Sequence, residues 1–170
     1  VAYQIGALQA MATYSDAKVT HLKPHGALNN MAAENREYAL AIGRAIKSVD
    51  RDIIYLALAG SEMEKAGREL GLRVAVEGFC DRQYEDDGNL TSRKLPGAVI
   101  KDPVVAARRV VDMVVNNTIT SRSGKKIPCK LHSLCVHGDE PTAVALARSV
   151  REALESAGVQ LMPLTDMQFD

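Results

Sequence analysis

The sequence has few aromatic residues and no excess of charge of either sign. Its 170 residues include no Trp, and Phe and Tyr together make up 4%. The 21 basic and 21 acidic residues give a formal net charge of +0. Nucleic-acid binders usually carry clustered basic residues, and base-stacking platforms need aromatic rings. The composition therefore argues against a nucleic-acid partner.

Cysteine and long apolar runs are also scarce. The three cysteines, Cys80, Cys129 and Cys135, form no C-x-x-C pair, which argues against a disulfide framework and for a reducing compartment. No stretch approaches the ~20 apolar residues of a membrane span, and no signal peptide is recognisable. We therefore predict a cytoplasmic protein without a membrane partner.

Several common catalytic motifs are missing as well. The sequence contains no G-x-x-x-x-G-K-[ST] phosphate loop, no G-x-S-x-G elbow and no H-E-x-x-H pair. With only four histidines, a His-rich metal cage is not expected. The chain opens at Val1 inside a helical apolar pattern formed by Ile5, Leu8 and Met11. This start predicts a helix entered midway, in a truncated or processed chain.

The apolar pattern alternates between strands and helices across a predicted single domain, 1–170. Strands are expected over 19–23, 53–58, 73–79, 133–136 and 159–162. A first helix is expected to end near residue 14, and further helices are expected over 35–49, 62–70, 103–116 and 140–157. A small hairpin is expected over 119–127, and a long loop over 80–94. Strands that alternate with helices indicate an α/β protein with a parallel sheet. Periodicity alone leaves open whether the sheet is open or part of a closed barrel.

Two expected strands are each followed by a His-Gly pair. Lys23 ends the first expected strand and His25 follows it, with Pro24 ending its ladder. His137 follows Leu134 to Val136, with Asp139 just beyond. Loops at the carboxyl ends of parallel strands usually carry the chemistry of such folds. The pattern favours one polar site built from distant segments, although a His held only by backbone hydrogen bonds is the alternative.

Acidic and basic residues at the third strand add further candidates. Glu77 lies in an apolar strand, where a carboxylate with a raised pKa is a candidate general acid or base. The alternative is a structural ion pair of Arg82 with Glu77 or Asp81. Arg93 lies in a Gly- and Pro-containing loop that is either a lid over an anion or a solvated surface loop. Asp139 is also expected to cap the helix that follows it.

Three motifs together resemble the LamB/YcsF family, the A subunit of the prokaryotic ATP-dependent 5-oxoprolinase. They read K-P-H-G-A-L-x-N from residue 23, E-x-F-x-D-R-x-Y-x-x-D-G-x-L-x-x-R-x-x-P-G-A-V-I from residue 77, and C-V-H-G-D-x-P-x-A-V from residue 135. Asn29 departs from the Tyr usual in the family. The family's N-terminal D-L-N-C-D-like, H-A-G-D-like and A-H-P-like motifs do not occur here.

The resemblance implies a fold, a reaction and a set of site residues. The fold would be a parallel β/α barrel of the glycoside hydrolase/deacetylase type, here incomplete without its N-terminal strands, so this piece alone is expected to be inactive. The reaction would be ATP-dependent opening of the 5-oxoproline lactam to glutamate. The catalytic candidates are Lys23, His25, Glu77 and His137, the substrate or phosphate contacts are Arg82, Arg93 and Asp139, and the candidate metal ligands are Asp81, His137 and Asp139.

The resemblance also implies ligands and partners. ATP, expected with Mg²⁺, would be handled jointly with two further subunits that resemble the parts of allophanate hydrolase, and a homo-oligomer is conceivable. Two other functions stay open. One is a metal-dependent deacetylase or amidohydrolase that acts on a small amide or sugar. The other is a non-catalytic subunit that binds the substrate or a partner.

Overall fold

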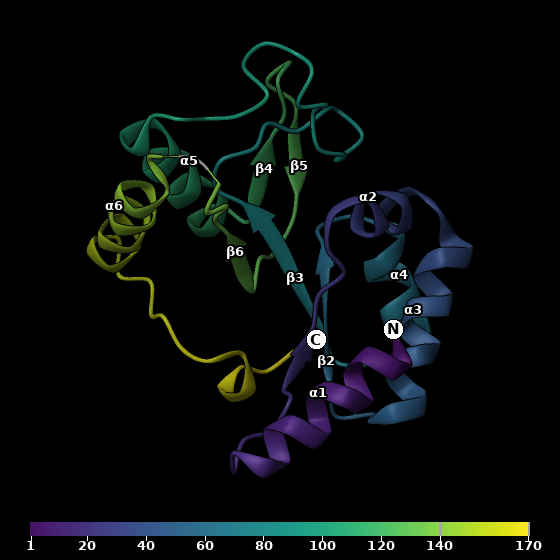
Figure 1. Cartoon of the computed structure of the whole chain (residues 1–170). Coiled ribbons are helices and arrows are strands. Elements are labelled where there is room, and N and C mark those ends of the chain that lie inside the picture. Colours follow the sequence, from purple (N-terminus) through teal and green to yellow (C-terminus); the bar gives the residue numbers. More distant parts are fainter. Residues whose placement is uncertain (140, 170) are drawn as a thin grey trace. The chain divides into compact units, whose positions relative to one another are not determined.

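The computed structural model describes residues 1–139 and 141–169. It divides them into two compact units, residues 1–76 with 167–169 and residues 77–166. The elements are α1 (Ala2–Tyr14), β1 (His21–Leu22), α2 (Gly26–Glu34), α3 (Arg36–Val49), β2 (Ile54–Leu58), α4 (Glu62–Glu69), β3 (Val74–Phe79), α5 (Pro103–Val115), β4 (Thr118–Thr120), β5 (Lys126–Pro128), β6 (Ser133–Cys135), α6 (Ala143–Ser156) and the 3-10 turn η1 (Leu164–Asp166) (Figure 1).

In the first unit, the strands lie side by side in sequence order. β1 pairs in parallel with β2, His21 facing Ile54 and Leu22 facing Tyr55, and β2 lies beside β3. Every residue of β2 is buried, as its continuous apolar run predicts. α3 begins after Asn35, whose Oδ1 accepts the amide N–H groups of Glu37 and Tyr38. α3 and α4 lie side by side in Figure 1.

In the second unit, the carboxyl-terminal half of β3 pairs in parallel with β6. The register places Glu77 opposite Ser133 and Phe79 opposite Cys135. β4 and β5 form a separate antiparallel hairpin, as predicted for residues 119–127. α5 begins as expected at Pro103, because the Asp102 carboxylate accepts two amide N–H groups of its first turn.

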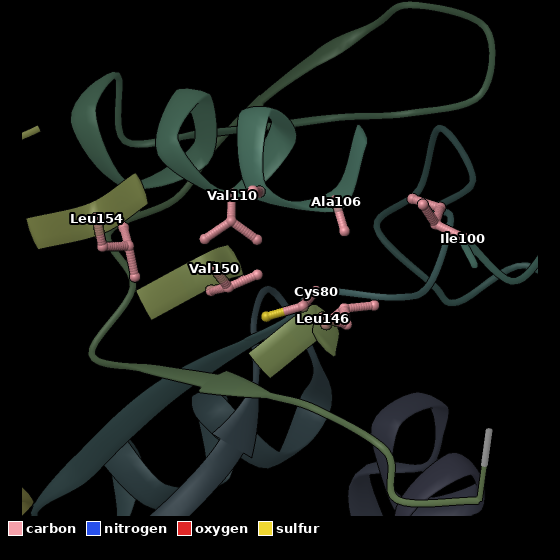
Figure 2. Packing of buried hydrophobic residues seen from close by; sticks show 8 residues of the cluster. Cys80, Ile100, Ala106, Val110, Leu146, Val150 and Leu154 are labelled. Atoms are coloured by element: carbon pink, nitrogen blue, oxygen red, sulfur yellow. The ribbon is translucent and has the colours of Figure 1, made fainter. Parts of the chain in front are cut away.

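The second unit buries an apolar cluster between α5 and α6. Figure 2 shows side chains from the two helices directed toward one another, with the Cys80 thiol beside Leu146 and Val150. Burial raises the pKa of the Cys80 thiol to about 12, so this sulfur is neutral at physiological pH. All three cysteines are free thiols. Cys80 therefore serves as a small apolar side chain of the core rather than as a nucleophile.

The parallel α/β fold class is confirmed, but several local predictions are wrong. Residues 26–34, for which the apolar pattern predicts no element, form α2, and its buried face consists of the small residues Asn29, Ala32 and Ala33. Residues 159–162 form no strand, because they are mostly exposed and pair with no neighbour. The helix expected from 140 begins at Ala143, and Glu140 lies outside the described residues.

Within residues 1–139 and 141–169, no helix is both long and apolar enough to cross a bilayer.

Candidate functional site

The best-defined polar pair lies at the carboxyl ends of β3 and β6. Asp81 follows β3 by two residues, and His137 follows β6 by two residues. The parallel register of the two strands brings these ends together. The His137 Nδ1 atom lies 2.8 Å from Asp81 Oδ1 and 2.8 Å from Asp81 Oδ2. Two residues 56 positions apart in sequence therefore form one pair that reaches from the interior to the surface.

This contact determines which nitrogen of the neutral His137 ring carries the proton. An ionised carboxylate only accepts hydrogen bonds, so Nδ1 carries the proton that faces Asp81. The other ring nitrogen, Nε2, then holds the lone pair in the neutral form. The Asp81 side chain is 5% exposed and the His137 side chain 24% exposed, so the pair is anchored inside and reachable from outside.

The His137 ring is also held by an aromatic neighbour. Its centroid lies 5.4 Å from that of the Phe79 ring, with an angle of 28° between the two planes. Phe79 is the last residue of β3 and is 4% exposed. Stacking on a buried ring restricts the orientations of the imidazole, so the direction of Nε2 is set by two contacts rather than one. The sequence did not predict this contact, because the motif that contains Phe79 and the apolar pattern of β3 do not show which ring it stacks on.

Glu77 is buried on β3 and bonded to its cross-strand neighbour. Its side chain is 4% exposed, and its Oε1 accepts a hydrogen bond from the Ser133 hydroxyl at 3.1 Å. The parallel register pairs these two residues directly. The structure therefore confirms that Glu77 is a buried polar residue with a partner; its catalytic role stays a prediction.

Arg93 and Asp139 form an ion pair between two loops. The Arg93 Nη1 lies 3.1 Å from Asp139 Oδ2, and both side chains are exposed. The hydrogen bond from Arg93 holds the pKa of Asp139 below its usual value. The Asp139 carboxylate does not cap α6, contrary to prediction, because it binds Arg93 and α6 starts at Ala143. This pair instead ties the Arg93 loop to the segment that carries His137.

Arg82 has an internal partner. It is 8% exposed, and its Nη2 donates to the Thr91 carbonyl at 2.6 Å. Burial, together with the like charge of Arg93, lowers the pKa of Arg82. The alternative of a structural ion pair of Arg82 with Glu77 or Asp81 is not seen among the described residues, where Asp81 binds His137 and Arg82 binds the Thr91 carbonyl. Arg82 thus braces the loop from 82 to 91, and its contact with a substrate stays a prediction.

Lys23 and His25 lie in the first unit, beyond the end of β1. Lys23 is half-buried, Pro24 is buried, and β1 ends at Leu22, as the proline predicts. His25 is exposed and occupies the position before the first residue of α2. The following Gly26 has a φ of +57°, a backbone conformation that suits glycine. Their membership of one site with His137 stays a prediction.

The candidate metal ligands divide into two sets. Asp81 and His137 are in contact, whereas Asp139 is bound by Arg93. Among the residues that the structure describes, no three His, Cys, Asp or Glu side chains gather in a way that could hold a metal ion. Metal binding at these positions stays a prediction.

Comparison with known proteins places the chain in a family. The sequence profile described as "LamB/YcsF family" matches residues 1–169. The chain belongs to the LamB/YcsF family. It is 52% identical over 97% of its length to a protein of Coprothermobacter proteolyticus named as the A subunit of 5-oxoprolinase, and 53% identical over 96% of its length to one of Rhodopseudomonas palustris with the same name.

A solved structure is similar to the chain in fold and sequence. The crystal structure of the lactam utilization protein from Thermus thermophilus matches 94% of the chain with a TM-score of 0.85 at 41% identity. The chain covers 64% of that structure, and 63% and 64% of the two curated relatives. These matches do not by themselves support the predicted truncation.

Proposed function

We propose that this LamB/YcsF chain takes part in opening the lactam of 5-oxoproline to glutamate. The proposal is supported by the names of its relatives, the A subunit of 5-oxoprolinase and a lactam utilization protein, at 41% to 53% identity. The observation that carries it in this molecule is the Asp81–His137 pair, a positioned proton acceptor at the carboxyl end of a parallel strand. The proposal concerns the assembled enzyme rather than this chain in isolation.

Lactam opening requires two proton movements. Water must lose a proton as it attacks the ring carbonyl, and the ring nitrogen must gain one as the C–N bond breaks. With Nδ1–H directed at Asp81, Nε2 of His137 accepts the first proton, and the imidazolium is stabilised by the Asp81 carboxylate. The same Nε2–H then donates to the departing nitrogen. The pair thus returns to its starting state after each turnover.

The substrate also carries negative charge that must be bound. 5-Oxoproline has a carboxylate, and phosphorylation of its lactam oxygen by ATP would add anionic phosphoryl oxygens. Arg93 is an exposed cation beside the His137 segment, and a guanidinium binds carboxylate or phosphoryl oxygens through paired N–H groups. We assign Arg93 to the binding of an anionic group of the substrate. This group competes with the Asp139 carboxylate for the Arg93 guanidinium.

ATP would transfer its γ-phosphoryl group to the lactam oxygen with release of ADP, which would make the ring carbon easier for water to attack. Breaking the C–N bond would then leave an acyl phosphate, which a second water would hydrolyse to the carboxylate of glutamate and inorganic phosphate. The sequence has no familiar phosphate loop, which favours handling of ATP and its Mg²⁺ jointly with the two partner subunits. Lys23 and Arg82 remain further candidates for contacts to phosphoryl oxygens. Location in the cytoplasm follows from the same proposal, since ATP is held there.

The test is formation of glutamate from 5-oxoproline by the purified protein with ATP, Mg²⁺ and both partner subunits. Omission of ATP, of either partner or of this chain should each abolish glutamate formation. Metal content is measured on the same preparation. ATP-independent release of acetate or ammonia from amides, with stoichiometric bound metal, would favour the deacetylase or amidohydrolase function. Tight 5-oxoproline binding without turnover under any condition would favour the non-catalytic function.

A further inference from the structure

Arg109 on α5 holds the backbone that carries Asp81. Its Nη1 donates to the Arg82 carbonyl at 2.8 Å and to the Phe79 carbonyl at 3.4 Å. Its guanidinium carbon also lies 5.3 Å from the centroid of the Tyr84 ring, within the range of a cation–π contact. One side chain therefore contacts residues on both sides of Asp81 in the sequence.

Tyr84 also contacts Phe79, through the backbone amide of that residue. Its buried hydroxyl accepts the Phe79 amide N–H at 2.8 Å, so Phe79 is bonded through its N–H by Tyr84 and through its carbonyl by Arg109. The Asp81 carbonyl accepts the Ile100 amide at 2.8 Å. The backbone from Phe79 to Arg82 is thus held by Tyr84, Arg109 and the Ile100 amide, and the Asp81 carboxylate lies 2.8 Å from Nδ1 of His137.

The charge of Arg109 has no acidic ion-pair partner in the described part of the chain. Its Nη2 is buried without a hydrogen bond, and burial lowers the pKa of the guanidinium. Placing a cation in such a position is costly, and an apolar side chain of similar size would serve packing alone as well or better. The contacts of its guanidinium are instead with the Phe79 and Arg82 carbonyls, on either side of Asp81 in the sequence. The cation therefore points to a role in holding the backbone that carries Asp81.

We propose that Arg109 is a positioning residue, which holds the Phe79–Arg82 turn so that the Asp81 carboxylate faces Nδ1 of His137. The proposal rests on the proposed function only in treating this pair as the proton carrier; the contact network itself does not depend on the substrate. Arg109 touches neither substrate nor reacting atoms in this account. It acts through Asp81, by fixing which nitrogen of His137 carries the proton.

The test is the tautomer of His137, read from the ¹⁵N shifts of its ring in NMR spectra of the protein without substrate. The wild-type ring is expected to be protonated on Nδ1 in its neutral form. In Arg109→Met and Arg109→Gln the Nδ1–H tautomer should lose its dominance, with the larger loss in Arg109→Met. Arg109→Lys, which keeps a cation and N–H donors, should restore most of it. Arg108→Met removes the exposed neighbouring arginine on the same helix and should change nothing.

A purely structural residue would lower the unfolding temperature without altering the tautomer. The proposal is therefore overturned if either folded variant, Arg109→Met or Arg109→Gln, keeps the wild-type tautomer. It is also overturned if neither variant folds although Arg108→Met does, because Arg109 would then serve folding alone. Since no substrate is present, this result stands apart from the lactam assay. A changed tautomer with no glutamate formation by the wild-type enzyme would contradict the proposed function and leave the positioning role intact.

Discussion

Nδ1 of His137 lies 2.8 Å from both carboxylate oxygens of Asp81, although the two residues are 56 positions apart in the chain. The two oxygens share one N–H donor, which leaves Nε2 as the reactive nitrogen. The pairing depends on the parallel register of β3 and β6, which sets the two loops beside each other. Changes that preserve this register but alter the pair therefore test the chemistry separately from the fold.

Asp81→Asn is expected to lower kcat of the reconstituted lactam reaction by about 10²-fold or more, with a smaller change in KM. The amide presents an N–H₂ group that favours the wrong ring tautomer, and it no longer stabilises the imidazolium. Steady-state glutamate formation measures the effect. Asp87→Asn is the control, because this exposed carboxylate bonds only within its own turn, to Asn89. Equal kcat for the wild type and Asp81→Asn would contradict the role of the carboxylate.

Arg93→Met is expected to raise KM for 5-oxoproline by about tenfold or more, with a smaller loss in kcat. The guanidinium is assigned to an anionic group that is present before and during the reaction, so its loss weakens both states. Lys94→Met is the matched control, since it removes the neighbouring exposed cation. The prediction fails if both variants shift KM alike, because general electrostatic attraction would then account for the effect.

Leu146→Ala is expected to destabilise the protein by about 2–5 kcal/mol in urea unfolding. The side chain is 3% exposed and belongs to the cluster between α5 and α6 in Figure 2, where its removal leaves a cavity. Val144→Ala on the same helix alters a side chain that is 75% exposed and should stay within about 0.5 kcal/mol of the wild type. Similar losses in the two variants would place the packed face of α6 elsewhere.

Gly67→Ala is expected to destabilise the first unit, although Ala favours helices. A Cβ atom at residue 67 would lie 2.6 Å from Val74 Cγ2 and 3.1 Å from Tyr55 Cδ1, both in buried strands. Overpacking costs about 1–3 kcal/mol, which exceeds the gain of up to about 1 kcal/mol in helix propensity. Gly6→Ala on α1 meets no atom within 4 Å and should instead be neutral or stabilising. Thermal unfolding of both variants shows whether each substitution lowers or raises the stability of the protein.

Asp86→Asn is expected to loosen the contact between its loop and the β4–β5 hairpin, most clearly above about pH 5. Asp86 Oδ1 accepts hydrogen bonds from Ser121 at 2.5 Å and Ser123 at 2.6 Å, and these bonds lower the pKa of Asp86. A lowered folded-state pKa means that the ionised carboxylate stabilises the fold above its unfolded-state pKa of about 3.9. That contribution is lost as pH falls through the folded-state pKa.

Amide hydrogen exchange at Ser121 and Lys125 measures this effect as a function of pH. The difference in protection between the wild type and Asp86→Asn should be constant above about pH 5 and shrink in more acidic solution. Asp87→Asn should leave these two amides unchanged. A difference that grows toward low pH would contradict the assignment.

Local signals in the sequence predicted much of the fold. Asp102 followed by Pro103 marks the start of α5, and the continuous apolar run at Ile54–Leu58 marks a strand buried on both faces. α2 was missed because its buried face consists of small residues, Asn29 among them, which carry little apolar periodicity. The late start of α6 was missed because Arg93, 46 residues earlier, binds the carboxylate expected to cap it.

The candidate site was predictable as a set of residues but not as a set of contacts. His137 and Asp81 were both recognisable, the first from its position after a strand and the second from the family motif. Their pairing depends on strand register, which no local pattern reveals. Arg109 was missed altogether, because an arginine within a helical pattern is usually solvent-exposed. Its contacts with Phe79, Arg82 and Tyr84 distinguish it from the exposed Arg108.

The most direct test of the central claim is glutamate formation by His137→Ala with ATP, Mg²⁺, 5-oxoproline and both partner subunits. His21→Ala, which removes an exposed histidine bonded to Thr20, is measured beside it. The account predicts that His137→Ala lowers kcat by about 10²–10⁴-fold with an unchanged circular dichroism spectrum, while His21→Ala retains wild-type turnover. A folded His137→Ala enzyme with kcat within a few-fold of wild type would contradict the role of the Asp81–His137 pair in lactam opening.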